Sequence, residues 1–244
     1  MPEPILKPVK AIAHGVSING EVEELLTRLK YVGNGVFILK DEQQGDLINP
    51  SMINDECPVA SALRIRHGGV IVRRPSDLRS IALSNVIHEA YSGVVGEWNK
   101  GWVTRVSFRL SRVIKYSGLE LRVVLEPDIL LGIGGEWHLI EVEAGKLRRS
   151  HEAQLALYWH LLKDEFNIVK AWLITINATI PYSTRDLNSI INGGLGYLAS
   201  VRRVLDSWGS NGPGMIIQGK CPCRWAPLCP VWGRYLTEGY LKPN

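Results

Sequence analysis

Acidic side chains gather in two apolar segments in the middle of the chain. Asp128 follows Pro127 in the first segment, and Glu141 and Glu143, two residues apart, share one face of a strand in the second. Carboxylates are costly to bury unpaired among Ile, Leu and Val. A divalent cation is the usual compensation for acids gathered in this way, and hard oxygen ligands suit Mg²⁺ or Mn²⁺. The sequence therefore predicts a metal site formed by these carboxylates.

A hairpin followed by a helix is expected to hold these acids in place. The two apolar runs flank Gly-Ile-Gly-Gly at positions 132–135, a composition that favours a β-hairpin, and Pro127 is expected to interrupt the first strand. Ser150 suits the N-cap of the following helix, on which Gln154 and Tyr158 lie side by side because they are four residues apart. The apolar face of this helix is predicted to consist of Leu155, Leu157, Leu161 and Leu162.

This order of acids, basic turn and helix resembles the RecB-like branch of the PD-(D/E)xK nucleases. That family carries Asp on one strand, Glu-x-Lys on the next and Gln-x-x-x-Tyr on the following helix. The corresponding positions here are Asp128, Glu141, Gln154 and Tyr158, with Glu143 where the family has lysine. The resemblance implies an α/β fold with a PD-(D/E)xK (restriction-endonuclease-like) core, in which helices flank a mixed sheet.

A histidine upstream of the acids matches a further element of that family. Residues 76–91 have the apolar periodicity of a helix, with Ser76 as the expected N-cap, and His88 lies within it. A lone histidine on such a helix is more often structural than a ligand. RecB-like nucleases, however, carry a metal-binding histidine in this place, often followed by Glu. The resemblance therefore implies a Mg²⁺ or Mn²⁺ site formed by His88, Asp128, Glu141 and the backbone carbonyl of Val142.

The chemistry implied by this site is hydrolysis of a phosphodiester bond. A bound cation stabilises charge on the phosphate and generates the attacking hydroxide, which the family's lysine helps to orient. Here Glu143 is a candidate general base, and Lys146 is the nearest lysine that reaches back toward the site. Gln154 and Tyr158 are expected to position the strand end or the loop. A degenerate, inactive enzyme is the third alternative.

Basic residues suggest a nucleic-acid partner without establishing one. The net charge is +4 and the sequence pI is about 8.9. Residues 103–115 alternate in a way that predicts one half-exposed strand. Its arginines form either a solvated sheet face or the wall of a groove that tracks a phosphate backbone, and a basic turn before the helix would also meet phosphates. The candidate DNA-binding residues are Arg105, Arg109, Arg112, Arg148 and Arg149, with Lys146 beside the last two.

The four cysteines indicate metal ligands or buried thiols rather than disulfides. Cys221, Cys223 and Cys229 lie within nine residues beside prolines, and Cys57 also precedes a proline. Four cysteines are a normal set for structural zinc. Their order resembles that of the iron–sulfur RecB-like nucleases, and in particular the CRISPR-associated RecB-like exonuclease family, the fourth of the core Cas proteins. That resemblance implies a [4Fe–4S] cluster, although the late spacing is Cys-x-Cys-x₅-Cys instead of the family's Cys-x₂-Cys-x₅-Cys.

The predicted organisation is an N-terminal extension (1–49) and a RecB-like nuclease domain (50–244) closed by the cysteine-rich C-terminal segment. The implied activity is that of a metal-dependent DNA exonuclease, or a combined exo- and endonuclease, acting on single-stranded DNA or DNA ends in CRISPR spacer acquisition beside the CRISPR integrase proteins. The alternatives are a degenerate DNA-binding scaffold of the adaptation complex and, more weakly, a zinc-stapled adaptor. No signal peptide or apolar run of membrane-spanning length is evident, so we expect a cytoplasmic protein without a membrane partner.

Overall fold

The structure is a computed structural model with a mixed α/β fold. It describes residues 3–12, 17–33, 36–40, 47–55, 57–106, 108–209, 212–213 and 229. The α-helices in these ranges are α1 (Asn19–Thr27), α2 (Pro58–His67), α3 (Pro75–Trp98), α4 (Arg149–Leu162) and α5 (Thr184–Asp206). Two 3-10 helices accompany them, η1 (Val9–Ala11) and η2 (Pro50–Asp55). None of the helices in the described ranges is long and apolar enough to cross a membrane.

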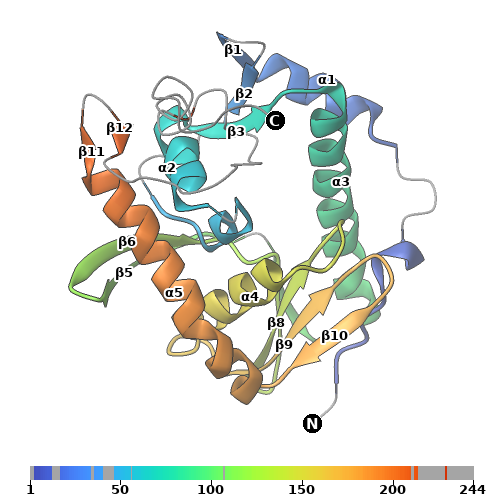
Figure 1. The fold of residues 1–244 in the computed structure, drawn as a ribbon. Helices are drawn as coiled ribbons and strands as arrows, with labels where there is room; N and C mark the ends of the chain where they lie inside the picture. Colours follow the sequence, from blue (N-terminus) through green and yellow to red (C-terminus); the bar gives the residue numbers. More distant parts are fainter. Residues whose placement is uncertain are drawn as a thin grey trace.

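The largest sheet among the described residues is mixed and five-stranded, in the order β10-β9-β8-β7-β4. Its strands are β4 (Val103–Val106), β7 (Ile129–Ile133), β8 (Glu136–Val142), β9 (Ile168–Ile174) and β10 (Thr179–Tyr182). Figure 1 shows its strands β8, β9 and β10 beside α4. The neighbours β8 and β9 are parallel and are connected by α4, as a parallel pair requires a crossover, whereas the other pairs are antiparallel. The hairpin predicted around positions 132–135 is confirmed as β7–β8, and Gly134 and Gly135 take the positive φ angles of its turn.

The two faces of this sheet are covered by different helices. Leu130, Leu139 and Leu173 point to one face, where they share a hydrophobic cluster with the buried side chains of α4 and α5. Ile140 and Trp172 point to the other face and pack in a second cluster with α3. This alternation follows from the period of two along each strand. The sheet is therefore buried on both sides, with α3 on one face and α4 and α5 on the other (Figure 1).

A smaller antiparallel sheet joins the N-terminal region to the rest of the chain. It consists of β1 (Leu29–Gly33), β2 (Val36–Lys40) and β3 (Gly69–Val72). Apolar residues of α1, of this sheet and of the first turns of α3 form one cluster, and α2 packs with β2 and β3 in another. Residue 49, where the N-terminal extension is predicted to end, lies between β2 and β3. The sheet itself spans that position, because β2 pairs with β3.

The single strand predicted over residues 103–115 is wrong, because this segment contributes to two sheets. β4 pairs with β7 of the five-stranded sheet, whereas β5 (Leu110–Tyr116) pairs with β6 (Leu119–Leu125) in a separate hairpin. Ser117 and Gly118 both have positive φ angles in the two-residue turn, as hairpins of this type require. A pattern of period two indicates which face of a strand is exposed. It does not indicate which other strand will pair with it in a sheet.

Two predicted N-caps are also wrong. α3 begins at Pro75, so Ser76 lies in its first turn, and the carboxylate of Asp77 accepts hydrogen bonds from the backbone N–H groups of Arg73 and Arg74. Proline at the first helical position favours this earlier start. α4 begins one residue before Ser150, with Arg148 at the N-cap position and no capping hydrogen bond from that side chain. Both helices thus start earlier than their serines suggested.

Helices α4 and α5 approach each other closely at one glycine. A Cβ atom on Gly194 would lie 2.8 Å from Cγ of Leu157, which is fully buried, whereas a Cβ on the neighbouring Gly193 would meet nothing within 4 Å. The glycines that weaken α5 by propensity therefore have different roles. Gly194 permits the helix contact, and Gly193 lies on the exposed side of the helix.

We expect Gly194→Ala and Gly193→Ala to change the stability in opposite directions. Removing a helical glycine stabilises a helix by roughly 0.5–1 kcal/mol. At residue 194 this gain is outweighed by an overpacking cost of about 1–3 kcal/mol, since the core must move to admit the new methyl group. Urea unfolding of the two variants measures the difference. A stabilised Gly194→Ala variant would contradict the close contact.

Candidate functional site

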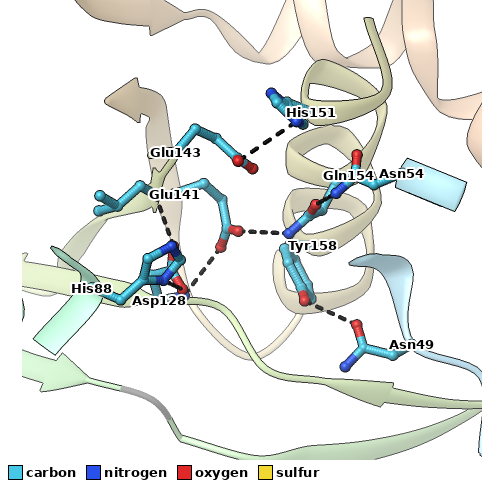
Figure 2. Close-up of polar contacts among 10 residues, drawn as sticks. Asn49, Asn54, His88, Asp128, Glu141, Glu143, His151, Gln154 and Tyr158 are labelled. Atoms are coloured by element: carbon cyan, nitrogen blue, oxygen red, sulfur yellow. Dashed lines mark hydrogen bonds and ion pairs between the residues drawn. The ribbon is translucent and has the colours of Figure 1, made fainter. Parts of the chain in front are cut away.

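The predicted acids meet where β8 ends, between α3 and α4 (Figure 2). Glu141 lies on β8, and Asp128 lies between β6 and β7, directly after the proline that separates these strands. The backbone N–H of Asp128 donates to Oε1 of Glu141 at 3.1 Å, and the N–H of Val142 donates to Oδ2 of Asp128 at 2.7 Å. These reciprocal bonds hold the two carboxylates side by side across the β7–β8 hairpin.

His88 reaches the same cluster from α3. Its Nδ1 lies 3.0 Å from Oδ1 of Asp128, and its side chain is 34% exposed. Burial alone lowers the pKa of the imidazole, but the charge and hydrogen bond of Asp128, together with the charge of Glu143, outweigh it and raise the pKa to about 9. Without a bound cation, His88 is therefore protonated at neutral pH and neutralises part of the charge of the acids.

Glu141 is the most deeply buried carboxylate of the cluster, with 2% of its surface exposed. Burial raises its pKa well above the ordinary value, and the negative charges of Asp128 and Glu143 raise it further. Hydrogen bonds from the Asp128 backbone and from Gln154 oppose this shift. The site is thus crowded with negative charge in a poorly solvated place, which is a state that a divalent cation would relieve.

Glu143 lies just beyond the end of β8 and stays in line with the sheet, because its backbone N–H donates to the carbonyl of Ile174 at 2.7 Å. Its Oε2 is 3.5 Å from Nε2 of His151, on the first turn of α4. Burial and the charge of Asp128 raise the pKa of Glu143 to about 7, against the opposing charges of His88 and Arg148. Sequence reasoning did not identify His151, since nothing in its surroundings marks it.

Gln154 and Tyr158 lie on the same side of α4, as their spacing predicts, with Gln154 directed at Glu141 and Tyr158 at Asn49 (Figure 2). Nε2 of Gln154 donates to Oε2 of Glu141 at 2.8 Å, and Oε1 of the same amide accepts from Nδ2 of Asn54 at 2.6 Å. The hydroxyl of Tyr158 donates to Oδ1 of Asn49 at 3.2 Å. Asn49 directly precedes η2, and Asn54 lies within it. Both are functional candidates that the sequence analysis did not identify.

Asn49 is brought to Tyr158 by the segment that precedes η2. Ile48 forms a parallel bridge with Val123 of β6, so the residue after it lies beside the end of that strand. Nδ2 of Asn49 donates to Oε2 of Glu126 at 2.7 Å. Glu126 is therefore another polar residue at the edge of the site that was not predicted.

The basic turn before α4 lies at the rim of the site. Lys146 and Arg149 are exposed, and in the described ranges no hydrogen bond or ion pair connects Lys146 to the carboxylates. The positive charge of Arg148 lowers the pKa of Glu143, so this side chain is electrostatically part of the cluster. Glu143 itself, and not Lys146, occupies the position next to the other acids.

The three arginines expected on one strand face are engaged in separate contacts. The guanidinium of Arg105 lies over the rings of Trp137 and Phe166, 5.4 Å from each centroid. Nε of Arg109 is 3.2 Å from Oε1 of Glu126. Arg112 pairs with Glu165. These arginines therefore do not form one continuous row, and their role in DNA binding stays a prediction.

A surface hollow of about 530 Å³ opens beside His88. It is lined by Asn85, His88, Glu89, Ser92, Gly93 and Val106. His88 thus belongs both to the acidic cluster and to the lining of this hollow.

Two of the four cysteines lie in the described part of the chain. Cys57 is the N-cap residue of α2 and is half-buried, and Cys229 is buried. Both belong to the hydrophobic cluster that contains β2, α2 and the end of α5. The chain therefore places an early and a late cysteine in the same hydrophobic cluster. Cys221 and Cys223 lie outside the described residues.

The metal-ligating atoms around Glu141 are of the types that a hard cation binds. Carboxylate oxygens of Asp128 and Glu141 with an imidazole nitrogen of His88 are ligands that Mg²⁺ or Mn²⁺ accepts. Their oxygens are directed at protein donors in the structure, and no three His, Cys, Asp or Glu side chains of the described ranges are arranged as a finished metal centre. The burial of Glu141 beside Asp128, which raises the pKa of Glu141, favours a cation at this place.

Comparisons with known proteins add little to this geometry. No family model and no curated protein matches the chain. A solved structure described as "Crystal structure of SSO0001" is similar, with 16% sequence identity and a TM-score of 0.47, and the match covers 88% of this chain and 94% of that one. A similarity of this strength carries no argument, so the interpretation of the site depends on its own contacts.

Metal binding predicts a rise in melting temperature that depends on Asp128. Mn²⁺ at about 100 times its dissociation constant stabilises the folded state by about 2.7 kcal/mol, because the ion binds the assembled carboxylates and not the unfolded chain. Asp128→Asn should remove this gain in a thermal unfolding assay. Glu97→Gln, at an exposed position of α3, is the matched control and should retain it. Equal Mn²⁺ stabilisation of wild type and Asp128→Asn would refute the site.

Proposed function

We propose that the chain is a metal-dependent nuclease that hydrolyses phosphodiester bonds in DNA, built on a PD-(D/E)xK-type core. The observation that carries this proposal is the buried carboxylate of Glu141. It receives one hydrogen bond from the backbone of Asp128 and another from Gln154, and His88 contacts Asp128 from the opposite side. Four positions that match the RecB-like pattern in sequence are thus linked by contacts in three dimensions.

Each residue has a proposed role in that reaction. His88, Asp128, Glu141 and the Val142 carbonyl would hold Mg²⁺ or Mn²⁺, which when bound stabilises charge on the phosphate and activates water. Gln154 orients Glu141 through its hydrogen bond, and Tyr158 anchors the segment before η2. The hollow beside His88 is the proposed place of the DNA strand.

Glu143 is the proposed general base. A base works best when its pKa is near the working pH, and burial together with the charge of Asp128 raises the pKa of Glu143 to about 7. Lys146 is exposed and makes no hydrogen bond or ion pair with the acids within the described ranges, which makes it the weaker candidate for the family's lysine. Arg148, whose charge acts on Glu143, would supply the positive charge near the phosphate that the family's lysine supplies.

The wider assignment follows the resemblance described for the sequence. We propose an exonuclease on single-stranded DNA or DNA ends, with Lys146, Arg148 and Arg149 near the phosphates, acting with the CRISPR integrase proteins in spacer acquisition. We also propose a [4Fe–4S] cluster held by Cys57, Cys221, Cys223 and Cys229. The proximity of Cys57 and Cys229 in one hydrophobic cluster supports this cofactor, and structural zinc is the alternative.

A degenerate DNA-binding scaffold is the second candidate. It is favoured by one feature, the presence of Glu143 where the RecB-like pattern has lysine. An added carboxylate increases the repulsion between the protein and a phosphate. Cleavage assays separate the two candidates, because both proteins would bind DNA and only one would cut it.

Cleavage should depend on the carboxylates in a graded manner. Asp128→Ala and Glu141→Ala should abolish Mn²⁺-dependent digestion of single-stranded DNA, since each removes a proposed ligand. Glu143→Gln should lower the rate by about 10²- to 10⁴-fold, the usual contribution of a general base, and Lys146→Ala should have a smaller effect. Circular dichroism controls for folding. If wild type binds DNA as well as Asp128→Ala does but cleaves none under any metal condition, the scaffold replaces the enzyme.

The cysteines predict iron in the protein as purified. Anaerobic preparation should give brown protein with about four irons per chain, and Cys57→Ala should lose the colour and part of its solubility. Metal analysis by mass spectrometry makes the measurement. Colourless protein with stoichiometric zinc would instead establish the structural zinc site.

A further inference from the structure

The side-chain amide of Gln154 is held from both ends. Its Nε2 donates to Glu141 at 2.8 Å, and its Oε1 accepts from Nδ2 of Asn54 at 2.6 Å. Figure 2 shows this line of contacts, with Asn54 entering from η2 and Gln154 lying between it and the acids. Asn54 lies 100 positions before Gln154, so the contact depends entirely on the tertiary fold.

The direction of these hydrogen bonds is set by the carboxylate at one end. A carboxylate that holds a cation is ionised and only accepts, so with a metal bound Gln154 presents its NH₂ group to Glu141 and its carbonyl to η2, which is the orientation of the two hydrogen bonds in the structure. Asn54 must then donate, which turns its own carbonyl away. In the described ranges that Oδ1 atom is buried and has no hydrogen-bond partner. A buried unsatisfied acceptor costs free energy, and the fold tolerates this cost in order to keep the donor on Gln154.

We propose that Asn54 is a positioning residue that fixes the amide orientation of Gln154 and so keeps a donor on Glu141. The orientation of Gln154 is a property of this chain's own contacts. Its consequence for a metal ion, through Glu141, rests on the proposed function. Asn54 donates to Gln154, and its proposed effect on the acids passes through that amide group.

Substitution of Asn54 by Asp and by Ala distinguishes a role in orienting Gln154 from a packing role and from a simple effect of added charge. With Asn54→Asp, the new carboxylate attracts the NH₂ group of Gln154, which turns its carbonyl toward Glu141 and removes a donor from it. With Asn54→Ala, Gln154 loses a partner but keeps its orientation toward Glu141. If Asn54 served only in packing, Asn54→Ala would weaken Mn²⁺ binding more than Asn54→Asp, since Asp is nearly isosteric with Asn. A simple charge effect predicts that the added negative charge tightens Mn²⁺ binding.

The measurement is the affinity of the full-length, anaerobically purified protein for MnCl₂ alone, by isothermal titration calorimetry at pH 8. We expect Asn54→Asp to weaken binding by about 10-fold or more, the factor for loss of one hydrogen bond to a charged group, and Asn54→Ala to weaken it less. Asn188→Asp adds the same charge at an exposed position of α5 and should leave the affinity unchanged. Binding by Asn54→Asp that equals or exceeds that of Asn54→Ala would overturn the proposal.

A double-mutant cycle decides the proposal if Asn54→Asp does not fold. Asn54 acts through Gln154, so Asn54→Ala should change the Mn²⁺ affinity in the wild-type background and by less than about twofold in a Gln154→Ala background. Equal fold-changes in the two backgrounds would show that Asn54 acts by another route.

Wild-type protein that binds no Mn²⁺ would refute the metal part of the proposed function without deciding the orientation of Gln154. The free energies of unfolding of the metal-free variants then decide it. If the orientation holds, the extra loss of stability of Asn54→Asp over Asn54→Ala is larger with Gln154 present than in a Gln154→Ala background, since charge repulsion acts equally in both. An extra loss of the same size in the two backgrounds would overturn the inference independently of the metal.

Discussion

The burial of one carboxylate, that of Glu141, constrains everything around it. A carboxylate with 2% exposure is tolerated only if donors surround it. One donor is the backbone of Asp128, so the chain must turn at Pro127 and continue into β7 at a fixed register. The other is Gln154, so α4 must cross the sheet with that residue facing β8. The hairpin and the crossover helix are thus tied to the same two oxygen atoms.

The contacts continue outward from this carboxylate to parts of the chain that are distant in sequence. Gln154 is held by Asn54 of η2, and Tyr158 by Asn49 just before it. The same segment leads into Cys57, which begins α2 and packs in the hydrophobic cluster that also contains Cys229. One short stretch, 49–57, therefore connects the acidic cluster to the two described cysteines. This gives the proposed cofactor region and the proposed active site a common structural support.

The distribution of charge explains why this cluster is a functional candidate. Asp128, Glu141 and Glu143 lie together, with the imidazole of His88 beside Asp128 and that of His151 beside Glu143. The pKa values of Glu141 and Glu143 rise because burial and mutual repulsion both disfavour their charged forms. The protonated His88 offsets part of this charge, since the charge of Asp128 raises its pKa despite the opposing effect of burial. Local conflicts of this kind are expected where function, and not stability, selects the residues. A divalent cation is the partner that would resolve this one.

Local pattern was enough to determine the elements that carry the site, and tertiary structure decided what completes it. Periodicity and turn composition predicted the β7–β8 hairpin, the interruption at Pro127 and the side-by-side placement of Gln154 and Tyr158, because each depends on residues a few positions apart. The division of 103–115 between two sheets could not be predicted, since exposure does not identify a strand's partner. No local pattern in the sequence indicated Asn49, Asn54 or His151 either. Asn54 meets Gln154 across 100 positions, and only the packing of η2 against α4 brings the two amides together.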